Sequence, residues 1–288
     1  EGFTLGVAAE VYVGMDTRAT SPHLAALVVT GVEALGGRAH NYGLLTTPQL
    51  HFFVRVRNGI DGSTCPLESS YFEQLVVAYQ MVTPHRSASK LFVDCSNGIG
   101  APKLAVLAER LSDRLEIERF NVDGSVNEGC GAEHVQKGRV LPCGVVPTAD
   151  AGKRMASMDG DADRLVYFSV EAGGGVRLVD GDKIAVLFAR FIKAQLHAAG
   201  LSDDIALGCV QTAYANGAST AYLRDVVGAP VEFVPTGVKH LHKKAHDFDI
   251  GVYFEANGHG TVLVSPKALA VIDAGGTAIN TPVQLPVS

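Results

Sequence analysis

The chain of 288 residues is 47% hydrophobic, 19% charged and 7% aromatic, with a formal net charge of −6. This composition is typical of a soluble globular protein with two or three domains. The acidic balance and the lack of a basic cluster exclude a nucleic-acid-binding footprint and disfavour anionic membrane surfaces. The longest apolar runs are too short to cross a bilayer, and no secretory signal opens the sequence.

Five cysteines are scattered along the chain without a Cys-x-x-Cys pair. An odd and sparse set in a chain of this size predicts reduced thiols in the cytoplasm rather than a disulfide framework. We therefore expect a cytoplasmic protein, and the sequence gives no sign of an obligate protein partner.

Strand-like and helix-like segments alternate in chain order. Short apolar runs bounded by turn residues predict strands at 11–13, 91–94, 115–120, 154–158, 165–170, 205–210, 231–234 and 251–254. Apolar residues at helical spacing predict helices at 21–35, 49–57, 102–111, 182–196, 218–227 and 239–247. Ser21 as N-cap and Pro22 at the first helical position predict the start of the first helix. Residues 121–152 and 266–288 are predicted to be irregular. The alternation favours α/β layers with parallel or mixed sheets.

Three carboxylates stand at two-residue spacing between two predicted strands: Asp159, Asp161 and Asp163. Alternate side chains of a tight turn can converge on one point, and Gly160 and Ala162 leave room for the backbone to bend. Converging carboxylates repel one another unless a cation neutralises them, and oxygen-only ligands suit Mg²⁺, Mn²⁺ or Ca²⁺ rather than zinc. The alternative is a solvated acidic turn, which the density of carboxylates and the flanking strands disfavour.

An EF-hand loop is excluded, because its glycine at position six and glutamate at position twelve are replaced by Arg164 and Val170. The guanidinium of Arg164 beside the carboxylates has two possible roles. It can hold a phosphoryl oxygen by paired hydrogen bonds, or it can neutralise the cluster structurally. The residues alone leave both roles open.

Two further groups of polar residues have weaker signals. The turn at 255–260 places a carboxylate, an amide and an imidazole after a buried strand, which suits either sugar hydroxyls or an ordinary polar turn. His240, His242 and His246 lie in a predicted helix, where a solvated basic face is favoured over a zinc site.

Several longer segments together resemble the α-D-phosphohexomutase superfamily, over nearly the whole chain. They are residues 13–18 (VGMDTR), 42–51 (YGLLTTPQLH), 96–101 (SNGIGA), 159–164 (DGDADR), 210–217 (VQTAYANG), 236–242 (TGVKHLH) and 249–260 (DIGVYFEANGHG). The last of these resembles the acetylglucosamine branch of the superfamily rather than the phosphoglucomutase branch.

The resemblance implies tandem α/β/α domains with mixed sheets. It implies a truncated first domain at 1–88, a second domain with the metal-binding loop at 89–182, a third with the sugar-binding loop at 183–265, and an irregular tail at 266–288. It also implies that Asp159, Asp161 and Asp163 bind Mg²⁺, with the catalytic Arg164 near a phosphoserine. The sugar phosphate would be bound by Thr236, Gly237, His242, Glu255 and Asn257.

The activity implied is that of an isomerase. A phosphoserine would give its phosphoryl group to N-acetylglucosamine 6-phosphate, and the resulting bisphosphate would turn over and return the other phosphate. The 1-phosphate formed would feed the synthesis of UDP-N-acetylglucosamine. Glucose-type hexose phosphates are the less favoured substrates.

Two segments of the superfamily pattern are absent from the sequence. A serine followed by His-Asn-Pro is expected before Val13, and a C-terminal phosphate-binding domain with Arg-x-Ser-Gly-Thr is expected after the third domain. The favoured interpretation is an incomplete chain of the mutase. The alternative is a non-catalytic derivative that binds Mg²⁺ or a sugar phosphate. A truncated first domain would expose apolar surface, so low solubility is expected.

Overall fold

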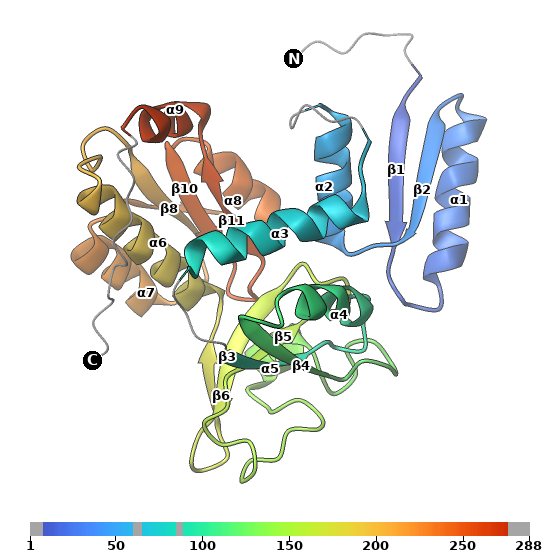
Figure 1. Ribbon diagram of the computed structural model, residues 1–288, viewed down its shortest axis with the longest axis horizontal. Coiled ribbons are helices and arrows are strands. Elements are labelled where there is room, and N and C mark those ends of the chain that lie inside the picture. The colour runs from blue at the N-terminus through green and yellow to red at the C-terminus, as the bar shows by residue number, and fades with distance from the viewer. Residues whose placement is uncertain (1–7, 60–64, 85–88, 276–288) are drawn as a thin grey trace. The chain divides into compact units, whose positions relative to one another are not determined.

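The computed structural model describes residues 8–59, 65–84 and 89–275 (Figure 1). The chain forms two compact units. The first unit comprises Glu1–Asp163 and Tyr167–Leu178, and the second comprises Arg164–Val166 and Val179–Ser288. Both contain strands flanked by helices, so the predicted α/β class with mixed sheets is confirmed.

The N-terminal part of the first unit is a parallel pair of strands with helices. It contains β1 (Glu10–Met15), α1 (Ser21–Ala34), β2 (Arg38–Leu44), α2 (Thr47–Arg57) and α3 (Glu68–Val82). β1 runs parallel to β2, with Val13 opposite Asn41 and a register shift before Met15. The N-cap of α1 is Thr20 and not Ser21, and the side chain of Thr20 makes no capping hydrogen bond.

The apolar face of α1 is exposed. Leu24 and Leu27 are each 55% exposed, whereas Ala25 is buried. The helical spacing of these residues predicts the helix correctly. Within the described residues, however, no other element covers the apolar face of α1. This is the kind of surface on which the expected low solubility rests.

The second part of the first unit is built on a five-stranded sheet in the order β4-β3-β5-β6-β7. Its elements are β3 (Ser89–Asp94), α4 (Gly100–Arg110), β4 (Leu115–Phe120), α5 (Ala132–Gly138), β5 (Met155–Met158), β6 (Leu165–Val170) and β7 (Val176–Val179). β3 is parallel to β4 and to β5. Because the carboxyl ends of parallel strands lie at one edge, Asp94 at the end of β3 lies next to the loop that follows Met158.

The second unit contains a four-stranded sheet in the order β11-β10-β8-β9. Its elements are α6 (Gly181–Ala198), β8 (Leu207–Thr212), α7 (Gly217–Tyr222), the π-helix η1 (Leu223–Val227), β9 (Val231–Val234), α8 (Val238–Ala245), β10 (Ile250–Phe254), β11 (Gly260–Val264) and α9 (Pro266–Ala274). β8 is parallel to β9 and β10, and β11 is antiparallel to β10. Every residue of β8 and of β10 is buried.

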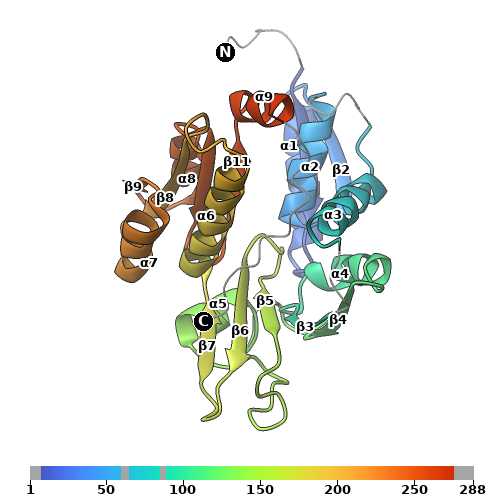
Figure 2. The same cartoon turned by 60° about the vertical axis from the view of Figure 1, so that its left-hand side comes forward.

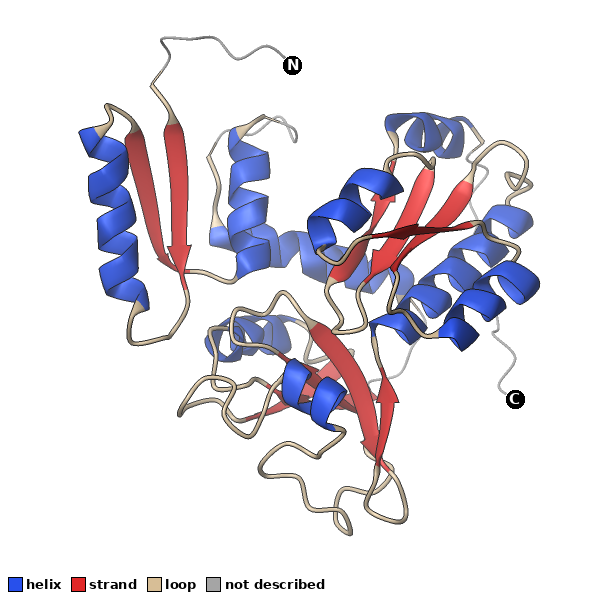
Figure 3. Cartoon of the chain, turned by 180° about the vertical axis from the view of Figure 1, so that it is seen from behind, coloured by secondary structure: helices blue, strands red, loops and turns tan. Residues whose placement is uncertain are grey.

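Helices cover both faces of this sheet (Figure 3). Figure 2 brings α6 forward. The core on the α6 side includes Ile184, Cys209 and Val252, and the one on the α8 side includes Leu241 and Tyr253. Long apolar runs in β8 and β10 are expected of strands buried on both faces.

Some segments predicted to be irregular are ordered. The stretch 121–152 contains α5, and the first part of the predicted irregular tail is α9, so that prediction is wrong for Pro266–Ala274. The hydroxyl of Ser265 caps α9 by accepting from Ala268 N at 3.1 Å, and Ala268 is buried in the α6-side core. The rest of the tail, residues 276–288, lies outside the described residues. None of the helices in the described part of the chain is long and apolar enough to traverse a membrane.

Candidate active site

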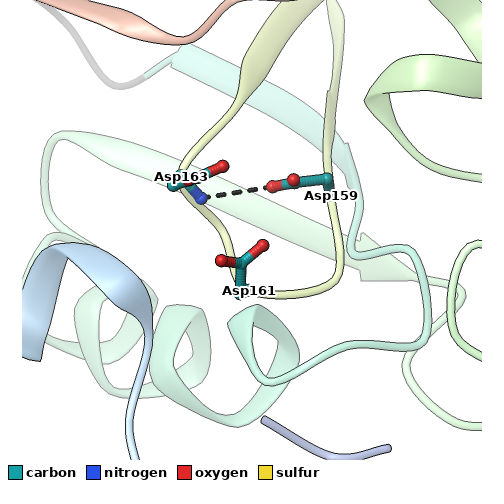
Figure 4. Close-up of side chains that lie close together, drawn as sticks. All are labelled: Asp159, Asp161 and Asp163. Carbon is teal, nitrogen blue, oxygen red and sulfur yellow. Dashed lines mark hydrogen bonds between the residues drawn. The ribbon is translucent and has the colours of Figure 1, made fainter. Parts of the chain in front are cut away.

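The loop between β5 and β6 brings the three predicted metal ligands together. Asp159, Asp161 and Asp163 each offer a carboxylate oxygen, and these atoms lie within 4.8 Å of one another. Figure 4 shows the three carboxylates turned toward a common centre. Asp159 is buried and the other two are half-buried. All three aspartates belong to the first unit.

Short hydrogen-bonded turns give the loop its shape. Asp163 N donates to Asp159 Oδ1 at 3.2 Å, and Ala162 N donates to Asp159 O at 3.1 Å. Ala162 has a positive φ of 57°, which is unusual for a residue with a side chain. Position 160 has no room for a side chain, because a Cβ there would lie 2.5 Å from Val126 Cγ1. The backbone therefore turns back sharply enough for alternate carboxylates to face one centre.

The turn after β3 packs against the metal loop. Gly98 packs directly on the loop, since a Cβ at this position would lie 2.3 Å from Gly160 O. Ser96 and Asn97 both have φ of 55°, and Asn127 has φ of 62°. Ser96 Oγ donates to Asn127 Oδ1 at 2.8 Å. Strained backbone of this kind persists only where surrounding contacts hold it, and it gathers at functional sites.

A buried carboxylate ties this turn to β5. Asp94 has no exposed surface, and its Oδ1 accepts hydrogen bonds from Ser96 N at 3.0 Å and Asn121 Nδ2 at 2.9 Å. Its Oδ2 accepts from Gly131 N at 2.7 Å and Ser157 Oγ at 2.6 Å. Four donors thus meet on one side chain, and one of them, Ser157, stands two residues before the metal loop begins. Sequence reasoning missed Asp94, because its partners are distant along the chain.

A cavity of about 370 Å³ lies beside the metal loop in the first unit. Asp161 and Thr47 line it, together with apolar residues of β1, α1 and α2. Arg18 and Asp16 add an ion pair to its wall, and the Ser21 hydroxyl donates to the same carboxylate. The metal loop therefore borders an open space that contains both charged and apolar surface.

The second unit holds the predicted sugar-binding residues in its own loops. Glu255 is buried, and its Oε1 accepts a hydrogen bond from Gly237 N at 2.9 Å. Its Oε2 accepts a long one from Asn257 Nδ2 at 3.4 Å. Gly237 has φ of 118°, which favours glycine, and Thr236 before it is exposed. The loop before α8 and the loop after β10 are thus brought together by one carboxylate.

Sequence reasoning missed Tyr214 in the same cluster. Its hydroxyl donates a long hydrogen bond of 3.5 Å to Glu255 Oε1. Burial raises the pKa of Tyr214, and the neighbouring Glu255 charge raises it further. The loop that carries Tyr214 is fixed by Asp182, whose Oδ2 accepts from Asn216 N at 2.9 Å. Burial raises the pKa of Asp182 as well.

The turn after β10 packs tightly against its surroundings. A Cβ on Gly258 would lie 2.0 Å from Leu165 O, and one on Gly181 would lie 1.8 Å from Glu255 O. Gly258 also has φ of 90°. Only glycine fits at these positions, so the backbone that carries Glu255 and Asn257 is held rigidly within the second unit.

His242 contacts Tyr253 of β10 and His246, the C-cap residue of α8. Its Nδ1 lies 2.8 Å from Tyr253 Oη, and its Nε2 lies 3.2 Å from His246 Nε2. Burial raises the pKa of Tyr253 to about 12, so this phenol keeps its proton at neutral pH. In the part of the chain that the structure describes, the aspartate triad is the only group of three possible metal ligands. His240, His242 and His246 are not part of that group.

Arg164 follows the metal loop directly and is half-buried. It belongs to the second unit by its contacts, whereas Asp163 belongs to the first. Its two possible roles stay predictions.

Comparison with known proteins decides the family. The models "Phosphoacetylglucosamine mutase AMG1, domain III" and "domain II" match residues 180–283 and 67–166, and "Phosphoglucomutase/phosphomannomutase, alpha/beta/alpha domain I" matches residues 4–64. The chain belongs to the α-D-phosphohexomutase superfamily. The domain II match begins at residue 67. The predicted domain boundaries stay predictions.

Individual members of the superfamily are similar over almost the whole chain. Phosphoacetylglucosamine mutase of Sus scrofa is 46% identical over 91% of this chain and 49% of its own length, and that of Arabidopsis thaliana is 48% identical with the same coverage. The crystal structure of Aspergillus fumigatus N-acetylphosphoglucosamine mutase in complex with GlcNAc-6P and magnesium has a TM-score of 0.86 at 39% identity, covering 98% of this chain and 57% of that one. The chain thus spans about half the length of the curated relatives it matches.

Proposed function

We propose that this chain provides the Mg²⁺ site and the sugar-binding loops of a phosphoacetylglucosamine mutase. Such an isomerase interconverts N-acetylglucosamine 6-phosphate and N-acetylglucosamine 1-phosphate. The observation that carries the proposal is the convergence of three aspartate oxygens within 4.8 Å, on a chain 46% identical to a mutase of that name. Supply of the 1-phosphate for UDP-N-acetylglucosamine in the cytoplasm belongs to the same proposal.

The donor set fits a magnesium ion. Asp159, Asp161 and Asp163 supply oxygen ligands only, which is what Mg²⁺ prefers at a metal–oxygen distance of about 2.0–2.1 Å. Ligands about 2 Å from a common centre are at most about 4 Å apart, so small side-chain rotations suffice to close the site. When bound, the ion would neutralise negative charge on a transferring phosphoryl group.

The remaining residues bind and orient the sugar phosphate. Glu255 accepts hydrogen bonds from sugar hydroxyls, and Asn257 both donates and accepts them. Gly237 N is already held by Glu255 Oε1, which keeps Thr236 at the rim of the site. Arg164 holds phosphoryl oxygens through its planar guanidinium. His242, whose Nδ1 lies 2.8 Å from Tyr253 Oη, adds an imidazole from the last turn of α8.

Titration calorimetry tests the proposal on the whole chain. N-acetylglucosamine 6-phosphate is titrated in the presence of Mg²⁺, with glucose 6-phosphate as the comparison ligand. The proposal expects tighter binding of the acetylated sugar. Equal binding of both sugars, or of neither, contradicts it.

An assay of turnover on the same chain separates the two candidate functions. Addition of N-acetylglucosamine 1,6-bisphosphate as the phosphoryl source gives the chain its best chance of activity. Measurable mutase turnover by this chain rules out the non-catalytic derivative.

A further inference from the structure

The N-terminus of α2 contacts the metal loop through one threonine. Thr47 Oγ1 donates a hydrogen bond to Asp161 Oδ2 at 2.6 Å, although the two residues are 114 positions apart. Thr47 N also donates to Asp161 O at 3.1 Å. Both the side chain and the backbone of Asp161 are therefore held by the same residue, within the first unit.

This contact is built on a first helical turn that is fixed independently. Thr46 is the N-cap of α2, and its Oγ1 accepts from Gln49 N at 3.2 Å. Gln49 Oε1 accepts in return from Thr46 N at 3.1 Å, which completes a capping box. Gln49 is fully buried. Thr47 follows as the first helical residue, and its N–H is one of the donors that a helix cannot satisfy internally.

The geometry affects the carboxylate in a specific way. A hydroxyl that donates to Oδ2 of Asp161 fixes the rotation of that carboxylate and leaves Oδ1 available to a cation. The positive end of the helix dipole at the same place favours a negative charge there. Groups that hydrogen-bond to metal ligands in this manner orient them before the metal arrives, which raises the affinity of the site.

We propose that Thr47 is a positioning residue of the metal centre, which holds Asp161 ready to bind a divalent cation. This inference rests on the proposed Mg²⁺ site and adds to it a contribution from α2. A hydrogen bond with only a structural role would stabilise the first unit equally with or without metal. A positioning hydrogen bond also changes the affinity for the metal itself.

Three variants of the whole chain separate these cases. Thr47→Val removes the hydroxyl but keeps the shape of the side chain, and Thr47→Ser keeps the hydroxyl. Thr30→Val is the matched control, because Thr30 makes an equivalent hydroxyl contact, to Ala26 O in α1, away from the loop. Mg²⁺ affinity is measured by titration calorimetry, and the Mg²⁺-dependent rise in unfolding temperature is the second readout.

The proposal expects Thr47→Val to weaken Mg²⁺ binding by about 10-fold or more and to reduce the rise in unfolding temperature. Thr47→Ser and Thr30→Val are expected to bind Mg²⁺ as the unchanged chain does. Equal affinity in Thr47→Val and the unchanged chain overturns the proposal, and so does an equal loss in Thr47→Ser. If the valine variant does not unfold cooperatively, Thr47→Ala takes its place, and failure of both to fold also counts against the proposal.

Mg²⁺ binding by the unchanged chain is measured first, because it tests the metal site independently of Thr47. Failure of the unchanged chain to bind Mg²⁺ rejects the proposed metal site. Binding by the unchanged chain with no effect of Thr47→Val rejects only the role of Thr47.

Discussion

Glu255 holds the loop before α8 by accepting a hydrogen bond from Gly237 N at 2.9 Å. The same carboxylate is proposed to accept hydrogen bonds from the sugar. If one buried carboxylate both shapes the loop and binds the ligand, the loss of its negative charge should weaken binding even where the shape of the side chain is kept.

Glu255→Gln tests this expectation. The substitution keeps the shape of the side chain but removes its charge, and hydrogen bonds to charged groups contribute about 1.5–3 kcal/mol. We expect the affinity for N-acetylglucosamine 6-phosphate to fall by roughly 10- to 100-fold, measured by titration calorimetry. Glu232→Gln, at an exposed position of β9, is the control and should bind as before. Unchanged affinity in Glu255→Gln would remove this residue from the site.

Asp94→Ala is expected to destabilise the first unit strongly. It leaves three buried donors, Ser96 N, Gly131 N and Ser157 Oγ, without their acceptor, and each such group costs about 1–3 kcal/mol. A loss of roughly 3–5 kcal/mol in the free energy of unfolding is expected from urea denaturation, since some of the donors can find water. Asp113→Ala removes an exposed carboxylate and should change stability by less than about 0.5 kcal/mol. A small effect of Asp94→Ala would show that the turn does not depend on this side chain.

Gly258→Ala should displace the sugar-binding loop. The added Cβ would meet Leu165 O, and the residue would have to keep φ of 90°. Strain and overpacking together are expected to cost about 2–4 kcal/mol and to weaken sugar phosphate binding. Gly217→Ala is the matched control, because a Cβ at the start of α7 meets nothing within 4 Å. Denaturation and ligand titration of the two variants should therefore differ clearly, and similar behaviour would contradict the packing described here.

Two buried thiols predict how stability depends on pH. Burial raises the pKa of Cys209 and the pKa of Cys95 from 9.0 to about 12. Unfolded thiols lose their protons above pH 9 while the folded ones keep them up to about pH 12. Their contribution to stability is therefore complete below pH 9 and is lost as the pH rises toward 12. Urea denaturation at pH 8, 9 and 10 should show this decline.

Cys209→Ala should make that decline shallower, whatever its effect on stability at pH 8. Parallel pH profiles of the variant and the unchanged chain would contradict the assignment. Alkylation at pH 8 gives an independent check, because the exposed Cys65 and Cys143 should react in the folded chain and the buried Cys95 and Cys209 should not.

The sequence predicted those parts of the site that depend on neighbouring residues. The spacing of Asp159, Asp161 and Asp163 determines a convergent turn locally, and the structure brings the three together. Glu255 and Asn257 likewise lie in one short turn. The resemblance to the superfamily was needed to connect the two loops to one reaction.

Residues held by long-range contacts could not be predicted. Asp94 and Thr47 act through partners as far as 63 and 114 positions away, and no local pattern marks such pairs. The strand β2 is mostly polar and only partly buried, so it lacks the alternation that indicates a strand. α9 was missed because its periodicity is short and depends on small residues such as Ala268.

The central claim is that the aspartate triad binds one divalent cation, and calorimetric titration of Mg²⁺ into the whole chain tests it most directly. The unchanged chain and the exposed-site control Asp123→Asn should each bind one ion, and Asp163→Asn should bind at least about 10-fold more weakly, since it loses a charged ligand. Equal Mg²⁺ affinity in Asp163→Asn and the unchanged chain, or no binding to either, would contradict the account.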